Sequence, residues 1–351
     1  MTKKIAGIQQ LGIGVSNLSE ARDWYKNNLG YDVVIFDEAA EANLMLRYTD
    51  NQPQKRHAIL AYNMKGGGGF EVWQYTSRTP VSPTFEIQLG DLGIFACKIK
   101  SPDVEKAYQE FKNKNVNIIS EISNSPEGKP HFFITDPYNN IFEIEEGFDW
   151  LLNQPKATGG NSGVTIGVSD MDSSVKFYSQ ILGYETVVYD QEQVFGDLKG
   201  VPGGGEKYRR VLLKHGEKRT GPFSTMLGDS TIELFESKDR TSRKIYENRL
   251  WGDLGYIHLC FDVIGMDHLK KECEEAGYPF TVDSANSFDM GEAAGHFSYI
   301  EDPDGTLIEF VETHKIPIIK KIGWYLNITK KKQKKPLPMW FFKVLNASRK
   351  V

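Results

Sequence analysis

Four glutamates lie inside apolar segments that have the character of β-strands, where a charged side chain is costly. Glu71 lies in Gly-Phe-Glu-Val-Trp, Glu143 in Ile-Phe-Glu-Ile, Glu233 in Thr-Ile-Glu-Leu-Phe and Glu309 in Leu-Ile-Glu-Phe. Burying a carboxylate carries a large free-energy penalty unless the group is paired with a cation or bound to a metal ion. These positions therefore predict ion pairs or metal ligands on strand faces.

His258 adds an imidazole to these four carboxylates. It lies in Ile-His-Leu-Cys-Phe-Asp-Val, where successive side chains alternate between two faces of a strand. The apolar face carries Leu259, Phe261 and Val263. The alternation places His258, Cys260 and Asp262 together on the opposite face, which we expect to line a cleft.

The elements that must position these residues occur twice, because the chain repeats itself. Residues 11–31, Leu-Gly-Ile-Gly-Val-Ser-Asn-Leu to Asn-Leu-Gly-Tyr, match residues 164–184 at a constant offset of 153. Gly-Asp-Leu-Gly occurs at 90–93 and 252–255, and an Asp-Pro pair begins seven residues before both Glu143 and Glu309. We predict two modules, 5–148 and 162–314, joined by a linker at 149–161 and followed by a tail at 315–351.

Each module divides into two units with the element order βαβββ. In the first unit, a strand precedes a helix with Asn17 as N-cap and an end near Leu29–Gly30. In the second unit, the helix is expected to have Ser101 as N-cap and Pro102 as first residue and to end near Asn113. Four such units predict an α+β fold with two cupped mixed sheets, helices outside and a cleft on the inner face.

The composition is that of an ordinary globular chain, with 351 residues, 40% hydrophobic and 25% charged. Residues 315–351 contain eleven Lys or Arg and no acidic residue. Since the whole chain has a net charge of −5, the first 314 residues carry −16. This balance argues against a nucleic-acid binder. No apolar run long enough to span a membrane and no secretory signal are present, and three cysteines without metal spacing fit a cytoplasmic location.

The repeated motifs resemble the vicinal oxygen chelate superfamily, which includes glyoxalase I, extradiol dioxygenases, methylmalonyl-CoA epimerase and the fosfomycin and bleomycin resistance proteins. The resemblance rests on Leu-Gly-Ile-Gly-Val-Ser-Asn-Leu, Ile-His-Leu-Cys-Phe-Asp-Val, Thr-Ile-Glu-Leu-Phe and Asp-Pro-Asp-Gly-Thr-Leu-Ile-Glu-Phe, and it covers residues 5–314. It implies tandem modules of this superfamily. Because one fold supports many chemistries, it does not by itself identify an activity.

The resemblance also implies metal-ligand positions on the first and last strands of the units. In the first module these positions are Gln10, Glu71, Ile94 (or Ala96 in another register) and Glu143. In the second module they are Gly163, Glu233, His258 and Glu309. Glyoxalase I dimers build each site crosswise, from the first unit of one module and the second unit of the other.

One crosswise set is complete and the other is not. The complete set is Gln10, Glu71, His258 and Glu309, and these donors suit one divalent ion, Zn²⁺, Ni²⁺, Mn²⁺ or Fe²⁺. The other set has lost two ligands, at Gly163 and Ile94. We interpret its two glutamates as structural relics.

The resemblance favours a metal-dependent isomerase or lyase of the glyoxalase or epimerase type, acting on a small oxygenated molecule. The metal would chelate two neighbouring substrate oxygens and stabilise an enediolate, with Glu309 or Glu71 as the base. The positions that hold glutathione in glyoxalase I are Gly14, Tyr75 and Leu254 here, which argues against a glutathione adduct. The residues expected to contact the substrate share the cleft-side faces of strands: Trp73, Tyr75, Cys260, Asp262 and Tyr299.

Two other functions stay open. An Fe²⁺ extradiol-type dioxygenase would use Tyr299, with His296 nearby, but Gly163 stands where such enzymes need a second histidine. A non-enzymatic binding protein would hold an apolar or aromatic ligand against Trp73 and Tyr75. The ligand set separates the enzymes from the binding protein, and Gly163 separates the isomerase from the dioxygenase.

The tail lies outside the resemblance. Residues 330–335 read Lys-Lys-Lys-Gln-Lys-Lys, and aromatic residues flank them at Trp324, Tyr325, Trp340, Phe341 and Phe342. This pattern predicts peripheral contact of residues 324–343 with an anionic membrane or another polyanion. Alternatively, the aromatic rings pack on the acidic body and the lysines are solvated. A fused pair of modules can close its site as a monomer, and a homodimer is equally compatible.

Overall fold

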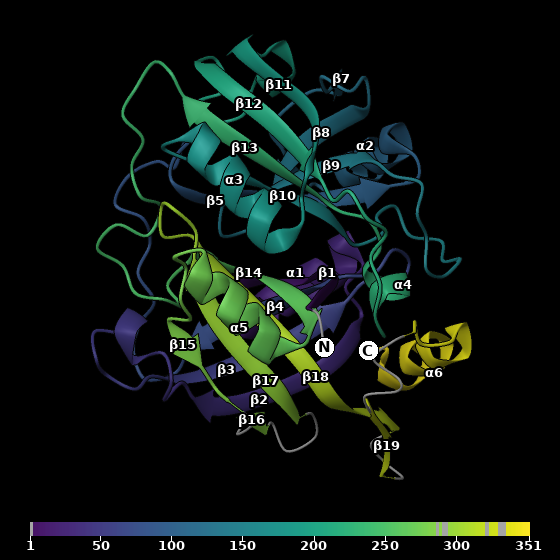
Figure 1. Cartoon of the computed structure of the whole chain (residues 1–351). Helices are drawn as coiled ribbons and strands as arrows, with labels where there is room; N and C mark the ends of the chain where they lie inside the picture. The colour runs from purple at the N-terminus through teal and green to yellow at the C-terminus, as the bar shows by residue number, and fades with distance from the viewer. Residues whose placement is uncertain (1–2, 286–287, 290–293, 320–322, 329–334) are drawn as a thin grey trace.

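The computed structural model describes residues 3–285, 288–289, 294–319, 323–328 and 335–351. It contains two curled mixed sheets that lie one above the other (Figure 1). The lower sheet has the order β15-β17-β18-β14-β1-β4-β3-β2, with β16 on β17 and β19 on β18. Its strands are β1 (Lys4–Gly14), β2 (Val33–Glu41), β3 (Lys55–Tyr62), β4 (Gly69–Tyr75), β14 (Gly255–Ile264), β15 (Val282–Asp283), β16 (Phe288–Asp289), β17 (Ala294–Glu301), β18 (Leu307–Ile319) and β19 (Trp324–Asn327).

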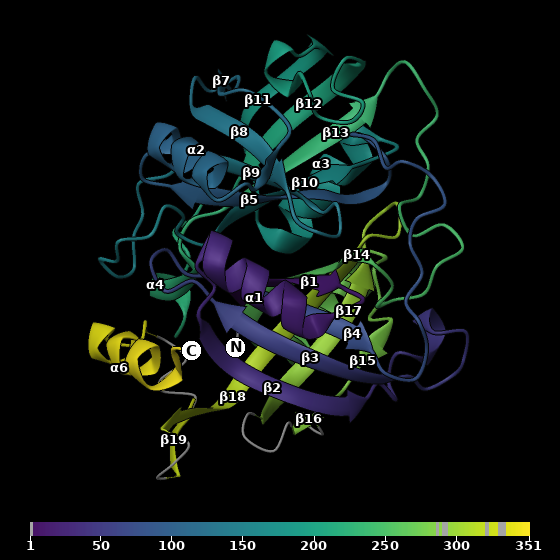
Figure 2. The same cartoon turned by 180° about the vertical axis from the view of Figure 1, so that it is seen from behind.

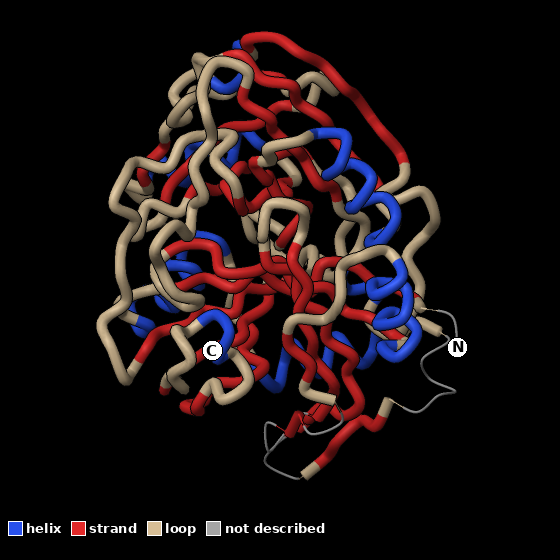
Figure 3. Tube along the Cα trace, turned by 60° about the vertical axis from the view of Figure 1, so that its left-hand side comes forward, coloured by secondary structure: helices blue, strands red, loops and turns tan. Residues whose placement is uncertain are grey.

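The upper sheet has the order β11-β12-β13-β10-β5-β9-β8-β6, with β7 on β8. Its strands are β5 (Gly93–Ser101), β6 (Asn117–Ile118), β7 (Ser123–Asn124), β8 (Pro130–Thr135), β9 (Ile141–Glu146), β10 (Asn161–Gly167), β11 (Thr186–Val194), β12 (Lys207–Lys214) and β13 (Thr231–Ser237). The helices are α1 (Leu18–Leu29), α2 (Val104–Asn113), α3 (Met171–Leu182), α4 (Ser224–Leu227), α5 (Met266–Glu275) and α6 (Met339–Arg349). Short 3₁₀ turns occur at Leu46–Tyr48 and Gly196–Leu198. Figure 3 shows how far strands outweigh helices in this chain.

The two sheets are assembled crosswise from the two modules. In the lower sheet, β1 of the first module pairs antiparallel with β14 of the second, from Lys4 opposite Ile264 to Gly14 opposite Gly255. In the upper sheet, β10 of the second module lies beside β5 of the first. Each sheet therefore contains one unit of each module. The predicted fold class, with four βαβββ units in two cupped sheets, is confirmed.

A continuous core lies on the helix-covered faces of the sheets. The alternating residues of β1 and β14 supply Leu11, Ile13, Leu259 and Phe261, all of which are fully buried. The buried faces of α1, α2, α3 and α5 pack on them. This packing turns the opposite face of the lower sheet, with Gly12 and His258, toward the inside of the cup.

The helix boundaries test the capping predictions. The Asn17 side chain accepts a hydrogen bond from the Glu20 amide, and Gly30 ends α1 with a φ of 74°, as predicted. The prediction for α2 is wrong by two residues. Its N-cap is Asp103, whose carboxylate accepts from the Lys106 amide, while Ser101 ends β5. A carboxylate at the N-cap fits the partial positive charge of a helix start better than a serine further upstream.

The tail continues the lower sheet and returns to it. Strand β18 runs on to Ile319, so the boundary assigned at residue 314 falls inside a strand, and β19 pairs with its end. Helix α6 then packs beside β2 and β18 (Figure 2). Among the described residues, no helix is both long and apolar enough to cross a membrane.

Candidate metal centre

The register of four adjacent strands brings three ionisable side chains to one point in the lower cup. Gly12 on β1 is opposite His258 on β14 and opposite Glu71 on β4. Glu309 on β18 is next to Cys260, two residues further along β14. A Cβ atom at position 12 would lie 2.7 Å from both ring nitrogens of His258, so only glycine leaves space for the imidazole. This glycine therefore has a direct role in shaping the site, and the second copy has Thr165 at the equivalent position.

The three side chains lie within metal-ligand distance of one another. His258 Nε2 is 3.1 Å from Glu309 Oε2 and 3.4 Å from Glu71 Oε2. One ligand atom from each residue can be chosen so that all lie within 4.8 Å. The amide of Gln10 completes the group, with Nε2 3.3 Å from Glu71 Oε2. Of the predicted ligands, the structure thus brings Gln10, Glu71, His258 and Glu309 together.

A bulge in β1 explains how two consecutive glutamines serve the cup. The β1–β14 register shifts between Ile8 and Gln10, so both Gln9 and Gln10 line the cavity. Gln10 reaches Glu71, whereas the Gln9 amide lies 3.5 Å from Asp262 Oδ1.

The chemistry of the donors fits a divalent ion. Gln10 Oε1, His258 Nε2 and Glu309 Oε2 are all buried. His258 Nε2 and Glu309 Oε2 face each other at 3.1 Å, and Gln10 Oε1 has no partner among the described residues, which is destabilising for a buried polar atom. An oxygen from an amide, an oxygen from each of two carboxylates and an imidazole nitrogen are suitable ligands for Zn²⁺ and neighbouring transition metals. A bound ion would satisfy the three atoms at once.

The electrostatics of the group are dominated by its charges. Burial alone would lower the pKa of His258, but the carboxylates of Glu309 and Glu71 raise it to about 10. Burial would raise the pKa of Glu71, but His258, Arg56 and Gln10 hold it below its ordinary value. The group therefore favours Glu71 in its ionised form, as a metal ligand must be.

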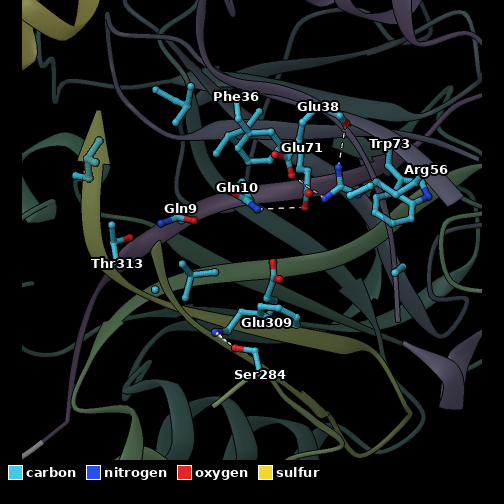
Figure 4. Close-up of a pocket in the computed structure, with 18 of the residues that line it drawn as sticks. Gln9, Gln10, Phe36, Glu38, Arg56, Glu71, Trp73, Ser284, Glu309 and Thr313 are labelled. Atoms are coloured by element: carbon cyan, nitrogen blue, oxygen red, sulfur yellow. Dashed lines mark hydrogen bonds and ion pairs between the residues drawn. The ribbon is translucent and has the colours of Figure 1, made fainter. Parts of the chain in front are cut away.

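A cavity of about 350 Å³ opens beside these residues. Figure 4 shows Glu71 and Glu309 directed into it from different strands, with Arg56 bonded to Glu38 on one side. Trp73 and Tyr299 line it as predicted, and the Tyr299 hydroxyl lies 3.4 Å from His258 Nδ1. Gln10, Glu71 and Glu309 line this ligand-sized pocket, whereas His258 lies behind the two carboxylates that it contacts.

Three predicted substrate contacts do not line this cavity. The Tyr75 hydroxyl bonds to the Trp251 carbonyl. The Cys260 thiol lies 3.7 Å from Gln9 Oε1, and Asp262 is buried beneath the same glutamine. Strand alternation predicted the face of Cys260 and Asp262 correctly, but it could not reveal that Gln9 covers these two residues. His296, named for the dioxygenase, pairs with Asp283 at 2.6 Å and lines no part of the cavity either.

The second cup contains a cation of its own. Lys98 Nζ lies 2.5 Å from Glu143 and 2.8 Å from Glu233, and all three side chains are buried. His131 adds a contact of 2.6 Å to Glu143, and Arg210 one of 2.5 Å to Glu233. These carboxylates raise the pKa of Lys98 above its ordinary value despite its burial. The two glutamates are thus members of a buried ion-pair network.

Lys98 was missed from the sequence, although the repeat contained a signal for it. In the strand register, Lys98 on β5 is opposite Glu143 on β9, just as Cys260 on β14 is opposite Glu309 on β18. Lys98 in the second cup is therefore equivalent to Cys260 in the first. The position equivalent to His258 is then Ala96, which has no donor atom. Arg56, which contacts Glu38 and lowers the pKa of Glu71 in the first cup, was also missed. It lies near the start of β3, just before the apolar residues of that strand, where a buried arginine is unusual.

Comparison with known proteins supports the same architecture. The family model of the Glyoxalase/Bleomycin resistance protein/Dioxygenase superfamily matches residues 7–144 and 162–310. A solved structure of a "putative dioxygenase" from Bacillus subtilis is similar with a TM-score of 0.57 and 14% identity, over 89% of this chain and 86% of that chain. A single-site variant of glyoxalase I from Zea mays is similar with a TM-score of 0.55 and 15% identity, over 89% and 94% of the two chains.

The search of curated protein sequences gave no match. At such low identity, the solved structures establish the fold and no particular activity. Since the family model matches each of the two modules over nearly its whole length, the chain belongs to the glyoxalase, bleomycin resistance protein and dioxygenase superfamily, as a two-module member.

Proposed function

We propose that the chain is a metal-dependent isomerase or lyase of the glyoxalase or epimerase type, acting on a small oxygenated molecule. The proposal depends on one observation: an amide, two carboxylates and an imidazole meet at one point beside the cavity, with their donor atoms directed at one another. Gln10, Glu71, His258 and Glu309 would hold one divalent ion. When bound, such an ion supplies Lewis-acid polarisation of neighbouring substrate oxygens.

The two carboxylates have different surroundings, which suggests different roles. Glu71 receives the Gln10 amide and lies near the guanidinium of Arg56, so it is the anchored ligand. Glu309 lines the cavity, and its Oε2 faces His258 Nε2 at 3.1 Å without an amide or guanidinium partner of the kind that Glu71 has. We assign Glu309 as the base that takes a proton from the carbon beside a substrate carbonyl and returns it to the neighbouring carbon.

The surrounding side chains orient the site and exclude water. Tyr299 approaches His258 Nδ1, which would fix the ring so that Nε2 faces the carboxylates. Trp73, Trp251 and Tyr299 form an aromatic wall on this side of the cavity. A site of low polarity strengthens the electrostatic interactions within it and protects a reactive carbanion from solvent.

The donor set argues against the other two functions. An Fe²⁺ dioxygenase of the extradiol type uses two histidines and one carboxylate, whereas this centre offers one histidine and two carboxylates. Gly163, the position of the second histidine, lies on β10 in the upper sheet. A protein that only binds apolar ligands would have no use for two carboxylates in its pocket, because their desolvation is costly.

The first test is metal content by elemental analysis of the purified full chain. We expect about one divalent ion per chain, its loss in His258→Gln, and its retention in His296→Gln, a matched buried histidine in the same sheet. Fe²⁺ as the bound ion would favour the dioxygenase, and no ion even after soaking with Zn²⁺, Ni²⁺, Mn²⁺ and Fe²⁺ would refute both enzyme proposals.

The second test addresses the chemistry. Incubation of the metal-loaded chain with small 2-hydroxy ketones and 2-oxo aldehyde adducts in D₂O should transfer deuterium to the carbon beside the carbonyl, detected by mass spectrometry. Glu309→Asp should slow this exchange, and Glu309→Gln should abolish it. Undiminished exchange in Glu309→Gln would refute the assignment of the base.

A further inference from the structure

The cavity beside the metal centre has two ends of different chemistry. Toward the Trp73 end it contains Arg56 and Glu38, which are bonded to each other. Away from that end, the wall consists of side chains from the second hydrophobic cluster of the chain: Leu60, Phe223, Met226, Ile316, Phe341 and Leu345. Glu71 and Glu309 lie on the strands that connect these two ends. A ligand bound at the metal centre would therefore have an apolar wall on one side.

The apolar end is closed by the C-terminal helix, which lies outside the residues that match the family. Phe341 and Leu345 of α6 line the cavity, while the family model ends at residue 310. Ile316 lies on β18 beyond the same limit. This part of the pocket is thus a property of this chain and not of the shared module.

Helix α6 is held in place by several specific contacts. The Leu337 amide donates to the Pro222 carbonyl before the helix, and Gln154 donates to Asn346 within it. After the helix, the Val351 amide donates to the Asp32 carbonyl, and Lys350 lies 3.5 Å from the Asp32 carboxylate. With contacts before, within and after it, α6 is a fixed wall.

The apolar wall is not explained by the docking of α6 alone. Phe342 on the same helix is completely buried in the second cluster and does not line the cavity, so it anchors the helix without contributing to the pocket. Phe341 and Leu345 are also buried from solvent, yet they border unfilled space. Protein interiors close up around apolar side chains unless something else occupies the volume. The shape therefore suits a ligand with an apolar part.

We propose that the substrate carries an apolar arm, an alkyl chain or an aryl group, next to the two oxygens that meet the metal, and that α6 forms the end wall of the arm's pocket. The proposal rests on the proposed function for the placement of the oxygens. It adds the chemical class of the substrate. Glu309 and Ile316 lie on the same strand, β18, which rises roughly 3.3 Å per residue. The separation between the metal centre and this wall residue therefore leaves space for an arm of several carbon atoms.

The test uses alkyl hydroxamates, which present two neighbouring oxygens and an alkyl chain of chosen length. Their affinity for the Zn²⁺-loaded full chain is measured by calorimetry, from acetohydroxamate to octanohydroxamate. Each methylene buried in an apolar pocket is worth about a fourfold gain in affinity. We expect this gain for each carbon until the pocket is full.

Two variants address the wall. Leu345→Trp, on α6, should remove the gain with chain length and leave acetohydroxamate binding unchanged. Ile316→Phe, on β18, should do the same and replaces the first variant if that one does not fold. Trp340→Ala is the matched control, since Trp340 lies on α6 but is exposed and lines no part of the cavity. It should keep the full gain.

The outcomes separate this inference from the proposed function. N-phenyl-1-naphthylamine, an apolar fluorescent probe, is titrated into the chain without added metal as a second measurement. If acetohydroxamate binds but octanohydroxamate binds no more tightly, the apolar arm is refuted while the metal site stands. If the naphthylamine binds and no hydroxamate does, the metal site is refuted while the apolar pocket stands. If no probe binds, both proposals are refuted.

Discussion

Replacing Lys98 by methionine tests whether this ammonium group holds the second cup together. The side chain is 3% exposed and lies between Glu143 and Glu233, each 1% exposed. Methionine fills a similar volume and removes the charge. Both glutamates then stay buried with one cationic contact fewer.

The magnitude follows from the partners that are left. Removing one member of a buried ion pair costs about 3–5 kcal/mol, because the opposite charge stays desolvated. Here His131 still contacts Glu143 and Arg210 still contacts Glu233. We therefore expect Lys98→Met to lower the free energy of unfolding by about 3 kcal/mol, the lower limit of that range. This loss corresponds to a roughly 150-fold smaller folding equilibrium constant.

The assay is urea unfolding at pH 7, followed by far-UV circular dichroism. Lys112→Met is the control, because Lys112 is an exposed lysine on α2, and it should change the free energy of unfolding by less than about 0.5 kcal/mol. Adding Glu143→Gln to Lys98→Met should recover part of the loss, because it removes one of the two buried carboxylates that lost a cationic contact. A Lys98→Met variant as stable as the control would refute the view that Lys98 compensates these carboxylates.

Three further predictions concern other parts of the molecule. Gly12→Ala should leave the chain folded but reduce its metal content severalfold, because the new methyl group displaces the imidazole; unchanged metal by elemental analysis would contradict this. Although burial lowers it, the adjacent carboxylates of Asp197 and Glu143 raise the pKa of His131 to about 9. Its contribution, of the order of 3 kcal/mol, is therefore complete below about pH 6.5 and lost as the pH rises through 9. Urea unfolding should show a steeper fall over this range in wild type than in His131→Gln. The exposed Trp340, stacked on another exposed tryptophan, should support binding to phosphatidylserine vesicles in a sedimentation assay; Trp340→Ala should weaken it, and no binding by wild type would rule out the membrane contact.

The sequence predicted which side chains meet in the lower cup where two independent patterns coincided. Alternation along a strand gave the face of His258, and the internal repeat gave the positions of Glu71 and Glu309 on other strands. Because strands of equivalent units pair in equivalent registers, these two patterns together bring residues nearly 240 positions apart to one point. Alternation also gave the correct face of Cys260 and Asp262, but it could not show that Gln9 covers them, since the bulge that turns Gln9 inward cannot be predicted from local sequence.

The tail could not be predicted in the same way, because it has no counterpart in the repeat. Its aromatic residues suggested either membrane contact or packing on the body, and the structure shows that they divide. Phe341 and Phe342 are buried, whereas Trp324 and Trp340 are 42% and 51% exposed. Most of the lysine run, residues 330–334, lies outside the described part of the chain. The contact with an anionic membrane therefore stays a prediction.

The ammonium group inside the upper sheet also bears on how the protein would respond to metal scarcity. Lys98 is part of the polypeptide, so the charge balance of that half is complete as soon as the chain has folded. If the lower cup binds a metal ion as proposed, a chelator would strip that ion but leave the Lys98 ammonium between Glu143 and Glu233. Under that proposal, the stripped chain would keep its upper half intact and could bind the ion again without renewed synthesis.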